Sequence, residues 1–294
     1  MMEQLARYAR LAEAELEVVL PPVEGPQARL HEAMRYAVMG GGKRLRPALV
    51  LAAAEAFGGI IGQALPAASA VELVHCFSLV HDDLPALDND ELRRGRPTWH
   101  KIFTESTAIL AGDALLALGF EVLALHQPKR GLSTEITVET LRILGRAIGS
   151  LGVAGGEFVD LEMEGQDVTA AQLEFIHLNK TAALIEACLL LGATVAGART
   201  SLREAAGEYG RNLGLLFQLV DDLLGEVGDE AKTGKPVGRD RELGKATYVR
   251  LYGLEGARAE AERLADKARE LADRFEPAEG FFHQLVDYVT GREA

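Results

Sequence analysis

Residues 106–125 of the chain read STAILAGDALLALGFEVLAL, and this stretch decides the fold class. A helix built from these residues carries apolar side chains on most of its faces, with Asp113 and Glu121 as its charged positions. Residues 182–196 have the same character. A helix that is apolar on most faces is typical of the interior of a protein, where other helices surround it. Both stretches therefore predict helices buried inside a bundle.

The rest of the chain continues this pattern on both sides. Ala, Leu, Glu and Arg dominate, apolar residues recur at intervals of three and four, and the alternation typical of β-strands is scarce. Breaks fall at glycine and proline clusters such as Gly58-Gly59. We therefore predict an all-α fold with helices at about residues 3–20, 26–39, 45–57, 65–85, 105–125, 134–149, 170–196, 201–226 and 255–274.

No linker, repeat or low-complexity tract divides the sequence, so we predict one all-α domain over residues 1–294. A chain of this length buries about 75% of the surface that its unfolded form exposes, and it needs no disulfide or structural metal to fold. Cys76 and Cys188 lie in apolar runs without the spacing of metal ligands, which is typical of buried thiols in a reducing compartment. We therefore expect a cytoplasmic protein.

The formal net charge of −13 limits the partners. So acidic a surface repels nucleic acid and anionic lipid, and we expect neither as a ligand. The longest apolar runs, such as residues 187–198, stop short of the ~20 residues of a membrane span, so we expect no stable membrane insertion. Positive charge gathers in two short segments, residues 43–46 and 93–96. Such clusters on an acidic protein indicate a small anionic ligand.

Two pairs of adjacent aspartates, Asp82-Asp83 and Asp221-Asp222, each follow an apolar helical run. Adjacent carboxylates repel each other, and the negative end of a helix dipole disfavours them further. A divalent cation reverses both effects, and Mg²⁺ prefers one or two carboxylates together with water and phosphate oxygens. The two pairs, with arginines soon after the first, therefore predict Mg²⁺ binding.

These segments form an ordered series of motifs over nearly the whole chain. The series is Gly41-Gly42-Lys43-Arg44-Leu45-Arg46-Pro47, Asp82-Asp83 to Asp88 with Arg93-Arg94-Gly95, Leu110 to Leu115, Lys180-Thr181, Phe217-Gln218 with Asp221-Asp222, Gly234-Lys235 with Gly238 and Asp240, and Gly244 to Tyr248. In this order the motifs resemble the trans-isoprenyl diphosphate synthases, or polyprenyl synthetase family, and especially its bacterial farnesyl diphosphate synthase-like branch. Each motif alone is weak, but the register of the whole series is highly specific.

The resemblance implies an all-α bundle with a central cavity, usually a homodimer, in which the two aspartate-rich motifs face each other across the cavity mouth. It implies that three Mg²⁺ ions bind with the allylic diphosphate, and that Asp82, Asp88 and Asp221 are the metal ligands. The residues that would bind the allylic diphosphate are Arg93, Lys180 and Lys235, and those that would bind isopentenyl diphosphate are Lys43, Arg46, His75 and Arg94. Lys180, Thr181 and Gln218 would face the developing allylic cation, and Asp83 and Asp222 complete the implied catalytic set.

The implied reaction is the head-to-tail condensation of isopentenyl diphosphate with dimethylallyl or geranyl diphosphate. Breaking the allylic carbon–oxygen bond leaves extra negative charge on diphosphate, which Mg²⁺ and fixed Arg and Lys side chains stabilise as it develops. An apolar cavity protects the cation from water. The departing diphosphate is implied to remove the final proton, so no dedicated protein base is expected.

Helix geometry bears on the length of the product. Phe77 precedes Asp82 by five residues and lies about 7.5 Å away along the same helix, at about 1.5 Å per residue. The resemblance implies that, in relatives of this branch, an aromatic residue at the position of Phe77 forms the cavity floor and limits the product to farnesyl diphosphate. We therefore expect farnesyl diphosphate, with Phe77 and Ser78 as chain-length residues. Geranylgeranyl diphosphate is the alternative, because Ser78 is small.

Two positions depart from the family pattern. Gly225 stands where the second motif normally ends in a third aspartate, one helical turn after Asp221. Glu157 stands where many relatives carry glutamine, and it adds negative charge. The first departure predicts weaker Mg²⁺ binding, and the two together allow a changed turnover or product.

Two other functions compete with chain elongation. A class I terpene cyclase would share the helical fold and an aspartate-rich motif, but it needs no site for isopentenyl diphosphate, whereas Lys43, Arg46 and Arg94 are present. A non-catalytic regulatory subunit of a prenyltransferase would explain Gly225. It would not explain why both aspartate pairs are intact, because a subunit without metal has no reason to keep adjacent like charges.

Overall fold

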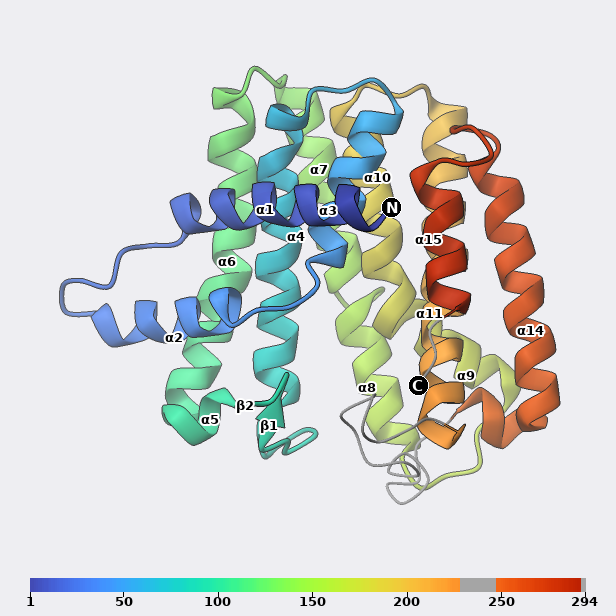
Figure 1. Cartoon of the computed structure of the whole chain (residues 1–294). Coiled ribbons are helices and arrows are strands. Elements are labelled where there is room, and N and C mark those ends of the chain that lie inside the picture. The colour runs from blue at the N-terminus through green and yellow to red at the C-terminus, as the bar shows by residue number, and fades with distance from the viewer. Residues whose placement is uncertain (228–246, 292–294) are drawn as a thin grey trace. The chain divides into compact units, whose positions relative to one another are not determined.

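A computed structural model describes residues 1–227 and 247–291, and this part of the chain is almost entirely helical (Figure 1). The predicted all-α fold is therefore confirmed. The elements in chain order are α1 (Met2–Val19), α2 (Ala28–Met39), α3 (Leu45–Ala56), α4 (Ile61–Asp82), β1 (Leu92–Arg93), β2 (Arg96–Pro97), α5 (Trp99–Ile102), α6 (Glu105–Lys129), α7 (Thr134–Ile148), α8 (Val153–Met163), α9 (Ala170–Ile176), η1 (His177–Ala182), α10 (Ala183–Val195), α11 (Thr200–Val227), α14 (Tyr248–Ala272) and α15 (Phe281–Thr290).

The described residues group into two compact units. The first unit comprises residues 2–142 and 194–197, and the second comprises Met1, residues 143–193 and the described residues from 198 onward. The aspartate pair Asp82-Asp83 belongs to the first unit and the pair Asp221-Asp222 to the second. The single domain with a central cavity stays a prediction.

The core of the first unit is built around α4 and α6, which lie side by side (Figure 1). Leu73 and Val80 of α4 and Leu115 of α6 are buried in one apolar cluster, to which α1, α2 and α5 also contribute. Gly119 of α6 permits a close approach, since a Cβ there would lie 2.8 Å from Val74 Cγ2. The stretch that predicted a buried helix therefore does pack against the helix that ends in the first aspartate pair.

A short hairpin follows the first aspartate pair. Strands β1 and β2 are antiparallel, with Arg93 opposite Arg96. The two residues between the strands, Arg94 and Gly95, have φ of 53° and 72°. Two successive positive φ values are characteristic of the type I′ turn, whose twist suits a tight hairpin. The sequence did not predict these strands, because each has only two residues.

The second unit has its own core, in which α11, α14 and α15 pack together. The Tyr209 ring meets the rings of Phe275 and Phe282 edge-on, at centroid distances of 5.7 and 5.2 Å, and its hydroxyl donates to the Phe282 carbonyl. Gly214 of α11 allows close contact with η1, since a Cβ there would lie 2.5 Å from the Ala182 Cα. This contact brings α11 against the residues next to Lys180 and Thr181.

Several predicted helix boundaries differ from the structure. The single helix predicted at 170–196 is divided into α9, the π-helix η1 and α10. Helices α8 and α15 were missed; glycines at positions 155 and 156 disfavour a helical reading of α8. Helix α14 begins at Tyr248, before the predicted residue 255, and contains Gly253 at φ 69°. Gly253, with its positive φ, interrupts the regular helix, so the residues before it do not continue the apolar spacing of the residues after it.

Among the described residues, three segments are long and apolar enough to cross a membrane by length and composition alone: α4, α6 and residues 170–195. By that criterion the expectation that no apolar segment reaches the length of a membrane span is wrong, because single charges such as Glu72 and Asp113 interrupt segments that are otherwise long enough. In their most apolar stretches, 72% of α4 and 61% of residues 170–195 are buried in the protein, but only 39% of α6. Burial thus explains the composition of α4. The prediction that residues 106–125 form a helix buried on most faces is wrong for α6, which leaves apolar surface exposed.

Candidate functional site

The first aspartate pair lies at the end of α4, and its two side chains have different surroundings. Asp82 is half-buried, whereas Asp83 is fully buried. The Arg93 Nε donates to the Asp83 carboxylate at 2.8 Å, and its Nη2 reaches Asp90 as well, at 3.5 Å. Burial raises the pKa of the Asp83 carboxyl, and the Arg93 guanidinium opposes that rise. Asp83 and Arg93 therefore form an ion pair inside the motif.

The loop after α4 brings Asp88 back toward Asp82. The Asp88 N–H donates to the Asp82 carbonyl at 2.9 Å, and Asn89, at φ 50°, donates to the Leu84 carbonyl. Both carboxylates are half-buried. Among the described residues, no three His, Cys, Asp or Glu side chains gather as a protein-only metal cage. Two carboxylates on one loop do fit Mg²⁺, which takes one or two carboxylates and completes its shell with water and phosphate.

The predicted basic motif forms a loop before α3 and the start of that helix. Lys43 is exposed, but Arg44 is buried at φ 49°, pairs with the buried Glu72 at 2.8 Å and donates to the Val38 carbonyl at 2.6 Å. Arg44 therefore anchors the loop inside the unit, a role that the sequence analysis did not assign. Glu72, within an apolar helix, was the signal that could have indicated a buried ion pair.

Arg46 and His75 are in contact, as expected of two ligands of one group. The Arg46 Nη1 lies 3.1 Å from the His75 Nε2. Because a guanidinium only donates, Nε2 is the acceptor and the ring proton lies on Nδ1. Burial, together with the nearby Arg46 and Arg94 guanidiniums, lowers the pKa of His75 well below its usual value. His75 is therefore neutral at physiological pH and leaves the positive charge to the arginines.

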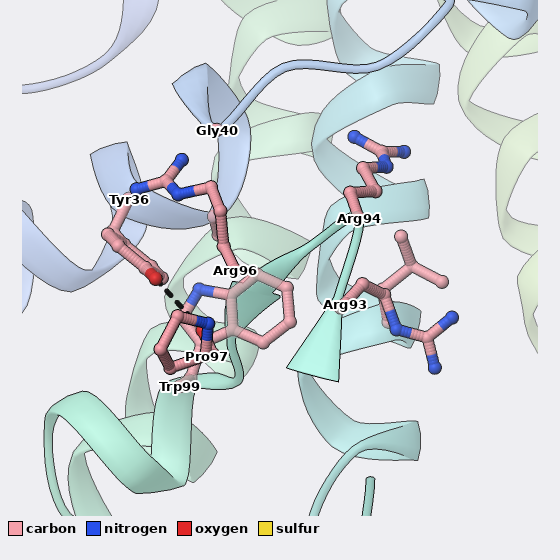
Figure 2. A pocket seen from close by; sticks show the side chains of 9 residues that line it. Tyr36, Gly40, Arg93, Arg94, Arg96, Pro97 and Trp99 are labelled. Carbon is pink, nitrogen blue, oxygen red and sulfur yellow. Dashed lines mark hydrogen bonds between the residues drawn. The ribbon is translucent and has the colours of Figure 1, made fainter. Parts of the chain in front are cut away.

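The hairpin joins the aspartate motif to the glycine loop at residues 40–42. Arg93, Arg94 and Arg96 of the hairpin and Gly40 of the loop line one pocket (Figure 2). Arg93 pairs with Asp83, whereas Arg94 is exposed and its Nη1 donates to the Gly41 carbonyl. A Cβ on Gly42 would collide with the Arg94 guanidinium. Gly41 and Gly42 have φ of 93° and 132°, values that favour glycine. The structure thus brings the predicted Arg94 against the loop that carries Lys43.

In the second unit, Lys180 and Thr181 lie on the π-helix η1, a geometry often found at functional sites. The Lys180 Nζ lies 2.8 Å from Glu157 and 2.6 Å from Asp160, both on α8. Burial disfavours the ammonium, but the two carboxylates raise the pKa of Lys180 above its usual value. Asp160 was missed by the sequence analysis, although its spacing of three residues from Glu157 places both on one helix face.

Thr181, Gln218 and Asp222 form a chain of hydrogen bonds. The Thr181 hydroxyl donates to the Gln218 Oε1 at 3.0 Å, and the Gln218 amide nitrogen donates to the Asp222 Oδ1 at 3.0 Å. Asp222 is buried, and its Oδ2 accepts the Tyr248 N–H at 2.9 Å at the start of α14. His177, whose pKa burial lowers to about 4, lies 3.9 Å from the same carboxylate. The carboxylate thus fixes which way the Gln218 amide points.

The remaining predicted residues fall in different places. Asp221 is half-buried, as Asp82 is, and Gly225 lies one turn later on α11. Phe77 is half-buried against the core of the first unit, with its ring 5.1 Å from the His81 ring, and the Ser78 hydroxyl donates to the His75 carbonyl. Lys235 lies outside the described residues.

Known proteins resemble this chain over most of its length. The polyprenyl synthetase family model matches residues 27–279. A chloroplastic geranylgeranyl pyrophosphate synthase from Catharanthus roseus is 45% identical, and the match covers 90% of this chain and 74% of that protein. The crystal structure of an FPP/GFPP synthase from Zymomonas mobilis is 35% identical, with a TM-score of 0.86 and coverage of 99% and 100% of the two chains.

A geranyltransferase from Helicobacter pylori, crystallised in complex with magnesium and isoprenyl diphosphate, is 32% identical, with a TM-score of 0.82 and coverage of 98% and 96%. The matched length is far more than half of the chain, and it includes both aspartate pairs and the basic loop. The chain therefore belongs to the polyprenyl synthetase family of trans-prenyl diphosphate synthases.

Proposed function

We propose that this trans-prenyltransferase condenses isopentenyl diphosphate with dimethylallyl or geranyl diphosphate and forms farnesyl diphosphate. The observation that carries the proposal is the hairpin of the first unit. Its Arg93 pairs with the aspartate motif, and its neighbour Arg94 donates to the glycine loop that precedes Lys43 and Arg46. One element thus joins a carboxylate loop suited to a metal-bound diphosphate to a basic loop suited to a second diphosphate.

The acidic residues have the chemistry that Mg²⁺ requires. Asp82 ends α4 and Asp88 lies in the loop after it, whereas Asp221 lies on α11 of the second unit. All three carboxylates are half-buried. We assign them as ligands of the three ions implied by the family resemblance. When bound, the ions neutralise the charge that develops on the departing allylic diphosphate. Arg93, Lys180 and Lys235 supply further positive charge to the same diphosphate.

We assign the binding of the second diphosphate, that of isopentenyl diphosphate, to Lys43, Arg46, His75 and Arg94. Arg46 and His75 already touch at 3.1 Å, and the neutral His75 presents Nδ1–H as a donor. We assign the stabilisation of the allylic carbocation to the oxygens of the Lys180 carbonyl, Thr181 and Gln218. The hydrogen bond from Gln218 to Asp222 orients the Gln218 amide, which in turn accepts from the Thr181 hydroxyl. An oriented dipole stabilises developing charge more strongly than a mobile one, because it needs no reorganisation during reaction.

Product length rests on Phe77 and its neighbour Ser78. The Phe77 ring is held between the apolar core and His81, so a growing chain that passes it must displace a packed ring. This supports farnesyl diphosphate as the main product. The second candidate is geranylgeranyl diphosphate, because the 45% identical relative from Catharanthus roseus carries that product in its name.

We also propose a cytoplasmic homodimer. Helix α6 exposes Ile109, Leu110 and Leu125, which are 44%, 56% and 48% accessible, and Val138 of α7 is 58% accessible. Apolar side chains along one long helix are a suitable interface between two copies of a chain. Both cysteines are buried thiols, as in a reducing compartment. Light scattering of the purified protein tests the dimer, and a monomeric mass contradicts it.

The decisive experiment is product analysis of the purified protein with Mg²⁺, isopentenyl diphosphate and dimethylallyl, geranyl or farnesyl diphosphate. We expect farnesyl diphosphate from the first two starters and loss of turnover with excess chelator. Geranylgeranyl diphosphate as the main product would favour the second candidate. No product from any starter would contradict elongation and favour a non-catalytic subunit.

Phe77→Ala tests the chain-length assignment. Removing the ring opens space beside Ser78, so we expect longer products, while the first condensation stays within about threefold of wild type. Chromatography of the dephosphorylated products measures the distribution. Phe103→Ala, an aromatic truncation in the same unit, serves as the control, and it should not lengthen the products. The same product ratio in Phe77→Ala and wild type would place the length limit on other residues.

A further inference from the structure

The guanidinium of Arg96, the first residue of β2, lies over an aromatic ring from helix α2. The guanidinium carbon of Arg96 is 4.1 Å from the centroid of the Tyr36 ring. Figure 2 shows the two side chains beside each other. A guanidinium over a ring at this distance is a cation–π contact, and its planar shape stacks well on the ring face. The sequence placed Arg96 in a basic cluster without giving it a role.

The Tyr36 ring is itself held on several sides. Its hydroxyl donates to the Pro97 carbonyl at 2.8 Å, next to Arg96 in the hairpin. The rings of Trp99 and Phe103 meet it edge-on, with centroids 6.2 and 5.8 Å away. The face that receives Arg96 therefore has a fixed orientation, and the guanidinium has little freedom to move.

The same guanidinium lies against the first glycine of the glycine loop. A Cβ on Gly40 would lie 2.6 Å from the Arg96 Nη1 and 2.8 Å from the Tyr36 carbonyl, so the close approach needs glycine. Arg94 contacts the other two glycines of the loop from the same hairpin. Three consecutive glycines lose much backbone entropy when they are ordered, so such a loop needs contacts of this kind to keep one conformation.

We propose that Arg96 is a positioning residue for the isopentenyl diphosphate site. Stacked on Tyr36, it holds Gly40 and so fixes the backbone that leads into Lys43 and Arg46. The proposal rests on the function proposed above for these two residues. Arg96 acts through the loop and through its planar stacking, so a lysine, which carries the same charge but cannot stack in this way, should not replace it.

Three variants separate this role from general packing. Arg96→Ala removes the stack, and Arg96→Lys keeps the charge. Arg29→Ala is the matched control, because Arg29 lies over the Phe103 ring at 5.6 Å in the same aromatic cluster but is not among the atoms nearest to a Cβ at Gly40 or Gly42 in the described structure. We expect about a tenfold rise in the KM for isopentenyl diphosphate in both Arg96 variants. The KM for the allylic diphosphate and kcat should stay within about twofold of wild type, and Arg29→Ala should match wild type.

Hydrogen exchange of the ligand-free proteins provides a readout that needs no turnover. The amides of residues 41–46 should exchange faster in Arg96→Ala than in wild type or Arg29→Ala, since the loop loses its contact. Unchanged exchange together with an unchanged KM in an active protein would overturn the role of Arg96 alone. Faster exchange in a protein that never consumes isopentenyl diphosphate would instead overturn the proposed function, and the assignment of Arg96 to that site with it.

Discussion

The two aspartate pairs of this protein look alike in sequence but are held by different partners. In each pair the first carboxylate, Asp82 or Asp221, is half-buried, and the second, Asp83 or Asp222, is buried. Asp83 is neutralised by a charged partner, Arg93. Asp222 accepts hydrogen bonds from neutral donors, the Tyr248 N–H and the Gln218 amide.

The comparison teaches how a helix tolerates adjacent carboxylates. Successive side chains on an α-helix point about 100° apart, so one member of a pair can face its own core while the other faces away. The inward member has found a structural partner in both cases. The repulsion that suggested a metal at the sequence level is thus partly relieved within each unit, and the remaining argument for Mg²⁺ rests on Asp82 with Asp88, and on Asp221.

The largest effect should come from the two outward members. Asp82→Ala and Asp221→Ala each remove a proposed metal ligand, and we expect the rate to fall about a thousandfold or more, because stabilisation of the leaving diphosphate is the largest catalytic contribution. Steady-state kinetics at saturating Mg²⁺ measure the fall, and circular dichroism checks that the helices remain. Near-normal turnover in either variant would remove that residue from the metal site. It would also break the parallel between the two pairs.

The inward members should differ from each other in stability. Asp83→Asn leaves the Arg93 guanidinium without its carboxylate, and breaking a largely buried pair costs about 3 kcal/mol. Asp222→Asn keeps an oxygen for the Tyr248 N–H but turns an amide nitrogen toward the Gln218 amide, which costs about 1–2 kcal/mol. Urea unfolding of both variants measures the difference. Equal losses would show that the charged and neutral partners are equivalent.

Asp222→Asn also sharpens the comparison through activity. When the Asp222 carboxylate becomes an amide, its nitrogen faces Gln218. The Gln218 amide then cannot keep the orientation in which it donates to Oδ1 and accepts from the Thr181 hydroxyl. We therefore expect a lower kcat with unchanged KM values, whereas Asp83→Asn should change the KM for the allylic diphosphate through Arg93. Full kcat in a stable Asp222→Asn protein would mean that the orientation of the Gln218 amide does not affect the reaction.

A smaller effect is expected at the carboxylates around Lys180, which has two anionic partners, whereas Arg93 has its main contact with one. Glu157→Gln removes one negative charge 2.8 Å from the Lys180 ammonium. We expect a lower KM for the allylic diphosphate, by about threefold, because the ammonium is then less compensated. The KM for isopentenyl diphosphate is the internal control. A higher KM for the allylic substrate would show that Glu157 serves to place Lys180 rather than to compete for it.

The smallest effect is expected one turn beyond the second pair. Gly225→Asp restores a third carboxylate on α11, so the Mg²⁺ concentration for half-maximal rate should fall by about two- to threefold. Replacing a glycine within a helix also adds about 0.5 kcal/mol of stability. Mg²⁺ titrations of the rate and urea unfolding measure the two effects. An unchanged Mg²⁺ requirement would mean that the two pairs already bind the ions equally well without the extra ligand.

The sequence by itself determined the fold class and the location of the candidate site. The apolar stretch at 106–125 predicts α6 because the helix-forming Ala and Leu residues that dominate it are a local property of the sequence. The aspartate pairs and the basic clusters were located from residue type and spacing, whereas Lys180-Thr181 was located through the family resemblance. The same local signals did not reveal the π-helix, because the π-bulge within 170–196 leaves no mark on an apolar pattern.

Only the tertiary structure decided which partner each charged residue takes. Arg93 with Asp83, Arg44 with Glu72 and Lys180 with Asp160 join residues that are 10, 28 and 20 positions apart. Such pairs form where two backbones come close, and that closeness depends on glycines such as Gly40 and Gly156, at which any Cβ would collide with a neighbouring element. Charge and spacing in the sequence say that a residue needs a partner, but the packing of the helices selects it.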